Sequence, residues 1–259
     1  MSTAIIVMGV TGRMGSTVAR LAAEAGDLKL AAVVERPGVD ISHIAHDCLR
    51  GDSVEEILPQ CPKAVVVDFT SPEASLATAG AAARHGNPVV VGTTGFSPEQ
   101  RRELEEYAAA SPVFWSPNMS VGINVLLKVL PELTRLLGDS YDVDIVELHH
   151  KHKKDAPSGT ALRLAECVAE AKEWTLAETG CYHREGIIGE RPKREIGVQT
   201  VRGGDIVGVH TVYFMGPGER IELTHQAHSR ENFAQGALRA ARWMSAARPG
   251  KLYAMHDVL

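Results

Sequence analysis

The stretch that sets the fold reads Ala4-Ile5-Ile6-Val7-Met8-Gly9-Val10-Thr11-Gly12-Arg13-Met14-Gly15. A short apolar run leads into glycines that recur at every third position. Apolar residues then follow with a helical period from Val18 to Ala25, and Gly26 comes next as a helix terminator. The pattern predicts a strand, a tight glycine-rich turn and a helix.

A second strand is predicted from Leu28 to Val34, and an acidic residue, Glu35, follows it directly. Glu35 lies 20 positions after Gly15 (35 − 15). Strand, glycine turn, helix, strand and acid together are typical of a Rossmann dinucleotide-binding unit, in which the acid holds the adenine ribose hydroxyls. The spacing is GxxGxxG, less common than GxGxxG. A purely structural turn is therefore an alternative, but it gives Glu35 no role. We expect a dinucleotide to contact Gly9, Val10, Thr11, Gly12, Arg13, Met14, Gly15 and Glu35.

The choice between NADH and NADPH depends on the adjacent pair Glu35 and Arg36. A glutamate favours NADH by accepting hydrogen bonds from the ribose, whereas an arginine can pair with the 2′-phosphate of NADPH. The presence of both predicts that either cofactor is used. A solvated Arg36 with no role in binding is the alternative.

Up to about residue 120, predicted strands alternate with predicted helices, which indicates a parallel sheet with crossover helices. Ligands of such sheets bind at the carboxyl ends of the strands. Two further loops occupy such ends, Gly92–Gly95 and Ser116–Met119. The predicted segments are strands at 63–68, 88–91 and 113–115 and helices at 72–85 and 98–110.

The second half of the chain has a different pattern. A helix at 121–137, a strand at 141–148 and a helix at 160–171 precede an irregular stretch, 173–194. Strands at 196–202, 206–215 and 220–226 follow, joined by short turns, which predicts an antiparallel sheet. A last helix, 230–246, is expected to return to the first domain. We therefore predict a dinucleotide-binding domain of residues 1–120 and 229–259, and a second, α+β domain of residues 121–228.

The composition limits the class of protein. The formal net charge is -5 over 259 residues, which argues against nucleic acid or an anionic membrane as partner. The N-terminus does not resemble a signal peptide, and no apolar run is long enough to span a membrane. Four widely spaced cysteines without a CxxC motif fit reduced thiols in a cytoplasmic protein.

A cationic cluster organises the second domain. It reads Glu147-Leu148-His149-His150-Lys151-His152-Lys153-Lys154-Asp155-Ala156-Pro157-Ser158-Gly159-Thr160. In the strand before it, Val143, Ile145 and Leu148 are apolar, with acidic residues between them. Ser158 is a predicted N-cap, and a helix N-terminus beside His and Lys side chains suits a small carboxylate. A metal site and a nucleic-acid surface are less favoured, because neither cysteines nor aromatic residues accompany the histidines.

The same cluster, extended to Ala161, closely resembles the signature of the 4-hydroxy-tetrahydrodipicolinate reductase family, also called dihydrodipicolinate reductases. The resemblance runs through most of the chain and includes the Gly-Arg-Met-Gly of the first turn. It implies reduction of a cyclic dicarboxylate by NADPH or NADH, in the pathway to diaminopimelate and lysine. It also implies a homotetramer, assembled through an open mixed sheet in the substrate and oligomerisation domain. From the residue types and the cysteines we expect no metal and a cytoplasmic location.

The resemblance also implies roles for individual residues. His149 becomes the proton donor or acceptor, and Lys153 becomes either a second proton donor or a clamp for a carboxylate. The substrate is expected to contact His150, Ser158, Gly159 and Thr160. The nicotinamide is expected to lie against Gly92, Thr93, Thr94, Ser116, Pro117, Asn118 and Met119.

Two alternatives stay open from the sequence. Another amino-acid-pathway dehydrogenase with the same nucleotide fold is one, and the His-His-x-His-Lys motif argues against it. A nicotinamide-binding sensor without catalytic activity is the other, and the intact His149 and Lys153 argue against that.

Overall fold

A computed structural model describes residues 2–44 and 47–259 of the chain. It contains two compact units. The first unit combines the residues up to Val121 with Glu231–Leu259, and the second unit is Gly122–Arg230. The last long helix therefore belongs to the first unit.

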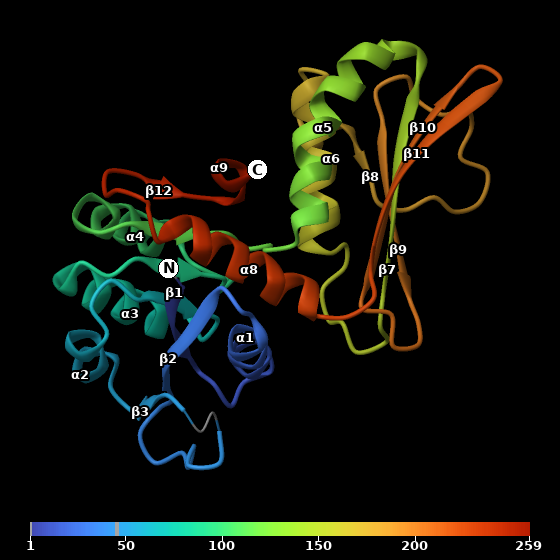
Figure 1. The fold of residues 1–259 in the computed structure, drawn as a ribbon. Helices are drawn as coiled ribbons and strands as arrows, with labels where there is room; N and C mark the ends of the chain where they lie inside the picture. The colour runs from blue at the N-terminus through green and yellow to red at the C-terminus, as the bar shows by residue number, and fades with distance from the viewer. Residues whose placement is uncertain (1, 45–46) are drawn as a thin grey trace. The chain divides into compact units, whose positions relative to one another are not determined.

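The first unit is built on a parallel sheet, which confirms the predicted Rossmann-type architecture (Figure 1). Among the described residues its strand order is β12-β6-β5-β4-β1-β2-β3, and every neighbouring pair is parallel. Sequence periodicity does not predict β3 or β12, because strands of two or three residues contain too few positions to show a period. The strands are β1 (Thr3–Met8), β2 (Leu28–Val34), β3 (Leu49–Gly51), β4 (Val65–Asp68), β5 (Val89–Val91), β6 (Val113–Trp115) and β12 (Leu252–Tyr253).

Helices cover both faces of this sheet, so its strands are apolar on both sides. On one face, Ile5 and Val7 of β1 pack with α1 (Arg13–Glu24) and α8 (Glu231–Met244). On the other face, Ile6 packs with α3 (Pro72–His85) and α4 (Pro98–Ala110). Shorter helical segments are α2 (Val54–Ile57), η1 (Leu58–Gln60) and α9 (Met255–Val258).

The second unit is built on a mixed sheet with strand order β11-β10-β7-β9-β8 in the described residues. Its strands are β7 (Asp142–His149), β8 (Gly180–Cys181), β9 (Ile196–Arg202), β10 (Gly208–Gly216) and β11 (Glu219–Ala227). The helices α5 (Val121–Leu137) and α6 (Gly159–Ala171) cover one face of the sheet (Figure 1), and η2 (Gly138–Ser140) and α7 (Leu176–Thr179) are short.

The prediction of a purely antiparallel sheet is wrong. β10 is antiparallel to β11 and β7, but β9 is parallel to β7 and does not pair with β10. The turn after β9 crosses the end of β7 instead of closing a hairpin: Gly203 N–H donates to the His149 carbonyl, and Lys151 N–H donates to the Gly204 carbonyl. β7 therefore lies between β9 and β10, and the sheet is the open mixed one that the family resemblance implies.

Strand β7 determines which side chains face the helices. Val143 and Ile145 are buried against α5 and α6, and Glu147 is buried as well, with no exposed surface. The sequence places Glu147 among the polar residues of the strand and Leu148 among the apolar ones. The structure reverses this, because side chains alternate along a strand and Glu147 shares a face with Val143 and Ile145.

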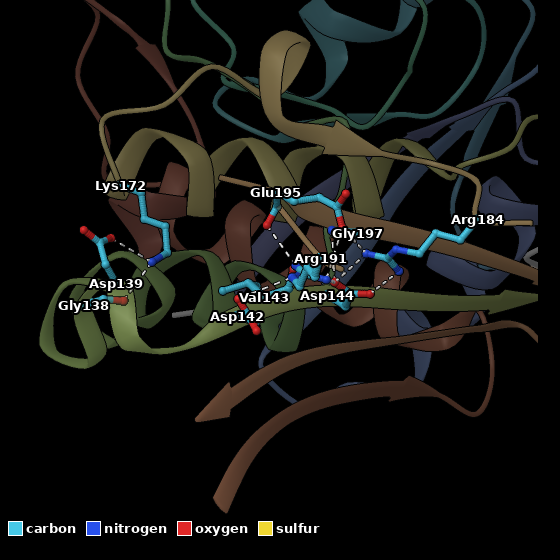
Figure 2. Close-up of polar contacts among 10 residues, drawn as sticks. All are labelled: Gly138, Asp139, Asp142, Val143, Asp144, Lys172, Arg184, Arg191, Glu195 and Gly197. Atoms are coloured by element: carbon cyan, nitrogen blue, oxygen red, sulfur yellow. Dashed lines mark hydrogen bonds and ion pairs between the residues drawn. The ribbon is translucent and has the colours of Figure 1, made fainter. Parts of the chain in front are cut away.

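The stretch from residue 173 to 194 is less irregular than its sequence indicates, since it contains α7 and β8. The rest of it is held on β7 by ion pairs (Figure 2). Arg184 Nη1 and Arg191 Nη1 donate to the two oxygens of Asp144 at 2.7 and 2.6 Å. Gly197 leaves room for this carboxylate, because a Cβ there would lie 2.3 Å from Asp144 Oδ2. Asp144 therefore has a structural partner set on the face of β7 opposite to Glu147.

Candidate active site

The first unit contains a cleft of about 770 Å³ at the carboxyl ends of β1, β2 and β4. Three of the predicted turn residues line it, Gly9, Thr11 and Gly12, together with Glu35 and Arg36. The other turn residues differ in position: Val10 and Gly15 are buried, Met14 packs on the core, and Arg13 is exposed.

Each glycine of this turn is required for a different structural reason. Gly9 has φ +62°, a conformation that other residues rarely adopt. A Cβ on Gly15 would lie 2.1 Å from the Gly9 carbonyl oxygen, so only glycine lets α1 start this close to the turn. The N-cap of α1 is Gly12, which has no side chain to cap the first turn. The N–H groups at the start of α1 therefore lie where an anion would bind.

Glu35 is held at the cleft by the turn itself. Its Oε2 accepts hydrogen bonds from Thr11 N–H at 3.0 Å and Thr11 Oγ1 at 2.6 Å, and its Oε1 accepts from Arg36 N–H at 3.0 Å. Partial burial acts to raise the pKa of Glu35, but the Thr11 and Arg36 hydrogen bonds outweigh it and lower the pKa. The carboxylate is therefore ionised and fixed. The Arg36 side chain is exposed and forms no ion pair with any described residue.

The loop after β5 is packed closely. The Phe69 ring packs so close to the backbone of residue 92 that only glycine fits, because a Cβ there would lie 2.0 Å from a ring carbon. Thr93 Oγ1 lies 2.8 Å from Ser75 Oγ, which donates to the buried Asp68 at 2.9 Å. Thr94 is exposed.

The loop after β6 is also built into the first unit. Met119 is buried, and its carbonyl oxygen would lie 1.8 Å from a Cβ on Gly236. Ser116 Oγ donates to the Asn118 carbonyl at 2.8 Å, and Asn118 Oδ1 accepts from Ser120 N–H at 2.9 Å. Both loops thus have ordered internal contacts, but they do not line the cleft that contains Gly9 and Glu35.

In the second unit, Glu147 is the centre of a buried hydrogen-bond network. Arg202 donates to both of its oxygens, from Nη1 at 2.7 Å and Nη2 at 2.8 Å, and Ser158 N–H donates to Oε1 at 2.9 Å. Thr200 Oγ1 donates to Oε1 at 3.2 Å. Burial acts to raise the pKa of Glu147, but hydrogen bonds from Arg202, His149 and Ser158 lower it to about 2. The carboxylate is therefore ionised at neutral pH.

His149 comes directly after this carboxylate on the same face of β7. Its Nδ1 lies 2.6 Å from Glu147 Oε2. Burial lowers the pKa of His149, while Glu147 acts in the opposite direction. A Cβ on Gly208 would lie 3.0 Å from His149 Nε2, so the glycine keeps the space beside this nitrogen open.

A second histidine that the sequence does not single out, His210, lies beside the first. The two rings meet edge to face with centroids 5.1 Å apart. His210 Nε2 lies 3.0 Å from Ser158 Oγ. Burial lowers the pKa of His210 to about 3, so the ring is neutral at physiological pH. Ser158 Oγ also accepts from Ala161 N–H at 3.2 Å, which confirms Ser158 as the N-cap of α6.

The loop between β7 and α6 presents the remaining predicted residues. Lys153 Nζ donates to both oxygens of Asp155, at 2.9 and 2.8 Å, and this lowers the pKa of Asp155. Arg202 Nη2 donates to the Asp155 carbonyl at 2.8 Å and so holds the loop against β9. His150 is partly exposed, and its Nδ1 has no hydrogen-bond partner among the described residues. The loop ends at Gly159, where α6 begins.

The structure thus holds the predicted residues of the cationic cluster at the end of β7, on the loop that follows and at the start of α6, and it adds partners that sequence reasoning missed. Ser158 uses both its N–H and its hydroxyl inside the protein, so its geometry is that of a helix cap. The missed partners are Glu147, Asp155, Arg202 and His210. For Glu147, Asp155 and Arg202 the sequence signal is a charge near the end of a predicted strand or in the loop that follows it, whereas His210 lies within a predicted strand and has no such signal. Among the described residues, no three His, Cys, Asp or Glu side chains form a group that could hold a metal ion.

The cleft of the first unit fits a dinucleotide. It combines a helix N-terminus that suits a pyrophosphate, a glycine turn that a Cβ would block, and a fixed carboxylate at the end of β2. No helix among the described residues has the length and apolar character needed to cross a membrane. The fold and the two sites define a two-domain nicotinamide-nucleotide-dependent oxidoreductase.

Comparison with known proteins identifies the family. Residues 3–119 match the family model "Dihydrodipicolinate reductase, N-terminus", and residues 122–259 match "Dihydrodipicolinate reductase, C-terminus". The chain belongs to the dihydrodipicolinate reductase family.

Relatives named 4-hydroxy-tetrahydrodipicolinate reductase span the whole chain. The protein from Nitratidesulfovibrio vulgaris (strain DP4) is 67% identical over 259 residues, with 100% of each chain covered. The protein from Myxococcus xanthus (strain DK1622) is 50% identical over 270 residues, with 98% of this chain and 96% of the relative covered.

Solved structures share the fold. A dipicolinate-bound dihydrodipicolinate reductase from Paenisporosarcina sp. TG-14 has a TM-score of 0.79 at 22% identity and covers 100% of both chains. A diaminopimelate dehydrogenase from C. glutamicum has a TM-score of 0.55 at 12% identity, covering 98% of this chain and 93% of that one. At this identity the dehydrogenase shows a shared fold and does not support the dehydrogenase alternative.

Proposed function

We propose that this protein reduces 4-hydroxy-tetrahydrodipicolinate to tetrahydrodipicolinate with NADPH or NADH, in the pathway to diaminopimelate and lysine, and that His149 transfers the proton. Loss of the 4-hydroxyl, with a hydrogen from the neighbouring ring carbon, as water forms a conjugated C=N/C=C system, and one hydride and one proton then add to that system. The observation that carries the proposal is the segment from the end of β7 to the start of α6. It combines a histidine backed by an ionised glutamate, a lysine and the start of a helix within eleven residues, 149–159.

The dinucleotide is held by the first unit. Gly9, Thr11 and Gly12 receive the pyrophosphate at the start of α1, and Glu35 receives the adenine ribose hydroxyls. Arg36 is available for a 2′-phosphate, since its side chain has no ion-pair partner among the residues described. The loops containing Gly92, Thr93 and Thr94, and Ser116, Pro117, Asn118 and Met119, form the nicotinamide side. A reduced nicotinamide bound there supplies the hydride.

Proton transfer is assigned to His149, because its Nδ1 is occupied by Glu147 and its Nε2 lies beside Gly208, which has no side chain to crowd it. Histidine is the natural proton donor near neutral pH. His210 does not compete for this role, because it is buried and its pKa is about 3.

The two carboxylates of the substrate are assigned to the rest of the loop. Gly159 and Thr160 open α6, where backbone N–H groups and the helix dipole favour an anion. His150 is assigned to contact the substrate, and its buried Nδ1 has no hydrogen-bond partner in the part of the chain that the structure describes. Lys153 either donates a second proton or clamps a carboxylate, and in both cases it must leave Asp155 or share it. Ser158 acts through its cap, which fixes the position of Gly159.

The experiment is an assay of NADPH and NADH oxidation with freshly prepared 4-hydroxy-tetrahydrodipicolinate. Turnover of this substrate with either cofactor, and none with homoserine or meso-diaminopimelate and the oxidised cofactors, is the expected result. Cofactor binding without turnover of any of these substrates would contradict the proposal and support a sensor.

The assembly is proposed to be a cytoplasmic homotetramer formed through the sheet of the second unit. Supporting this, the face of the sheet away from α5 and α6 carries Val146, Leu148 and Tyr213 partly exposed and Val201 45% exposed. The four cysteines form no disulfide within the described part of the chain, which suits a reducing compartment. Sedimentation velocity should detect a species of four chains. Val201→Lys should shift it to smaller species, and a monomeric wild type would contradict the proposal.

A further inference from the structure

Glu147 has no assigned function in the reaction, although it is the most completely engaged carboxylate of the second unit. It has no exposed surface and lies two residues before His149 on the same face of β7. Removing an ionised carboxylate from water costs several kcal/mol unless partners compensate. The carboxylate is compensated by hydrogen bonds from Arg202, Ser158 and Thr200. A further acceptor position on Oε2 is taken by His149 Nδ1.

The short contact between Glu147 and His149 determines which nitrogen of the ring carries hydrogen. An ionised carboxylate can only accept hydrogen bonds. Because the Glu147 carboxylate is ionised, the hydrogen between the two residues belongs to His149 Nδ1. A neutral imidazole carries one N–H hydrogen on its two ring nitrogens. With that hydrogen on Nδ1, Nε2 has a lone pair and can take up and release a proton.

We propose that Glu147 is a positioning residue that fixes the Nδ1–H tautomer of His149 and makes Nε2 the atom that exchanges the proton with the substrate. The inference rests on the proposed function only in naming His149 as the proton donor. The tautomer itself is a property of the protein without ligands. In the reaction, the Nε2–H bond of the imidazolium breaks and its proton passes to the substrate atom, while the Nδ1 hydrogen stays on His149 and remains hydrogen-bonded to Glu147.

Among the groups around His149, Glu147 alone favours its protonated form. The charged and titratable groups that face it are Glu147 on β7, Arg202 on β9, His210 on β10 and Lys153 on the following loop. Arg202 and Lys153 disfavour a positive charge on His149, and Glu147 is the only carboxylate of this set. Glu147 therefore stabilises the imidazolium as well as orienting the ring.

Arg202 fixes the position of the Glu147 carboxylate. It binds both oxygens of Glu147, so the carboxylate cannot rotate away from Nδ1, and it also binds the Asp155 carbonyl. Bidentate arginine–carboxylate pairs have a fixed geometry. The same guanidinium thus sets the orientation of His149 and the path of the loop that ends at Gly159.

The test is ¹⁵N NMR of histidine-labelled protein without ligands, with the His149 signals identified by their loss in His149→Ala. Wild-type His149 should show the Nδ1–H tautomer once it is neutral, whereas Glu147→Gln should shift it to the Nε2–H form or to a mixture. Glu147→Gln should also move the His149 titration to lower pH. Its kcat should fall about 10²-fold or more with a smaller change in KM, comparable to the loss when a buried acid behind a catalytic histidine is replaced by its amide.

Two controls keep the test decisive. Asp144→Asn removes another arginine-paired carboxylate from the same strand, on the opposite face, and should leave the His149 tautomer and titration unchanged (Figure 2). Glu147→Gln/Arg202→Met removes both charges, so it avoids an unpaired buried arginine if the single variant folds poorly. It should show the same loss of the Nδ1–H tautomer.

The NMR and activity results separate failure of the tautomer inference from failure of the proposed function. An Nε2–H tautomer in the wild type, or an unchanged tautomer and pH profile in Glu147→Gln, would overturn the inference. A wild type that shows the Nδ1–H tautomer but no turnover of the proposed substrate would count against the proposed function and leave the assignment of the tautomer standing.

Discussion

The Nδ1 atom of His149 lies 2.6 Å from Oε2 of Glu147, and Arg202 holds that carboxylate from the other side at 2.7 Å. The three residues come from two neighbouring strands of one sheet, β7 and β9. The contact leaves Nε2 as the reactive nitrogen and makes the protonation of His149 depend on Glu147.

The pH dependence of turnover should report His149. Burial lowers the pKa of His149 below its usual 6.5 in the protein without ligands. An acid must be protonated to act, so kcat/KM should decrease as the pH rises through this pKa, since kcat/KM reflects the free enzyme. A bound dicarboxylate favours the imidazolium, so the decrease in kcat should occur at higher pH. Profiles of both parameters from about pH 5 to 9 measure this; identical profiles for kcat and kcat/KM would contradict it.

Gly208→Ala should impair turnover without unfolding the protein. The new Cβ would lie 3.0 Å from His149 Nε2, so the ring must shift by a few tenths of an ångström. Misplacement of a reacting group by about 1 Å costs about 10²-fold, so a loss of about 10-fold in kcat is expected. The melting temperature should change little, and Gly203→Ala, which has open space around it, is the control. Equal activity of the two variants would show that the space beside Nε2 is not used.

Acid should destabilise the protein partly through His210. Its pKa is about 3 in the folded protein and 6.5 for an ordinary histidine. Between these values the unfolded chain binds a proton that the folded chain does not, so stability falls as the pH falls through this window. His149 and His225, whose pKa values burial also lowers, add to the same effect.

His210→Gln should therefore reduce the pH dependence of the unfolding free energy between about pH 6 and 4, by up to about 1.4 kcal/mol per pH unit. The glutamine amide can still accept a hydrogen bond from Ser158. Urea unfolding at several pH values gives the slope, and a slope equal to that of the wild type would show that His210 is protonated in the folded protein.

Glu147 should change the stability of the fold at lower pH than His210 does. Its pKa is about 2 in the folded protein and 4.5 for an ordinary glutamate, so its contribution is complete above 4.5 and is lost as the pH falls toward 2. The difference corresponds to about 3 kcal/mol at neutral pH. In Glu147→Gln/Arg202→Met the loss of stability between these pH values should be smaller than in the wild type, as measured by acid unfolding. A loss of the same size would show that the carboxylate is not paired in the fold.

Arg36→Ala should weaken NADPH binding more than NADH binding. The Arg36 side chain is exposed at the cofactor cleft, and a charged hydrogen bond to phosphate is worth about tenfold or more in affinity. Fluorescence titration should give an increase in Kd of about tenfold for NADPH and little change for NADH. Arg84→Ala is the matched control, because Arg84 lines the same cleft but is paired with Glu55 at 2.7 Å. Equal losses for both cofactors would show that Arg36 does not read the 2′-phosphate.

Much of the first unit could be predicted from the sequence because its signals are local. The strand before Gly9, the helix after Gly12 and the strand before Glu35 each lie within a few residues of the glycine or acid that marks them. The mixed sheet could not be predicted in the same way. The position of β9 beside β7 depends on where the Gly203–Gly204 turn passes, which is a contact between distant segments.

The cationic loop was predicted as a site, but its supporting residues were not. Glu147 reads as a solvent-facing acid because the arginine that permits its burial lies 55 positions away. His210 lies in a strand pattern in which a histidine has no distinguishing signal. Ser158 was predicted both as a helix cap and as a substrate ligand, and the structure gives its hydroxyl to Ala161 N–H and His210.

The central claim is that His149 transfers the proton, and the kcat of His149→Ala with freshly prepared 4-hydroxy-tetrahydrodipicolinate tests it most directly. General acid catalysis contributes about 10²–10⁴-fold, so kcat should fall within that range while KM changes less. NADPH affinity should stay near the wild-type value, because the proposed dinucleotide site is at the Gly9–Gly15 turn of the other unit. Lys153→Ala combined with His149→Ala should cost less than the product of the single effects if both act on one proton. A His149→Ala protein with near-normal kcat would contradict the account.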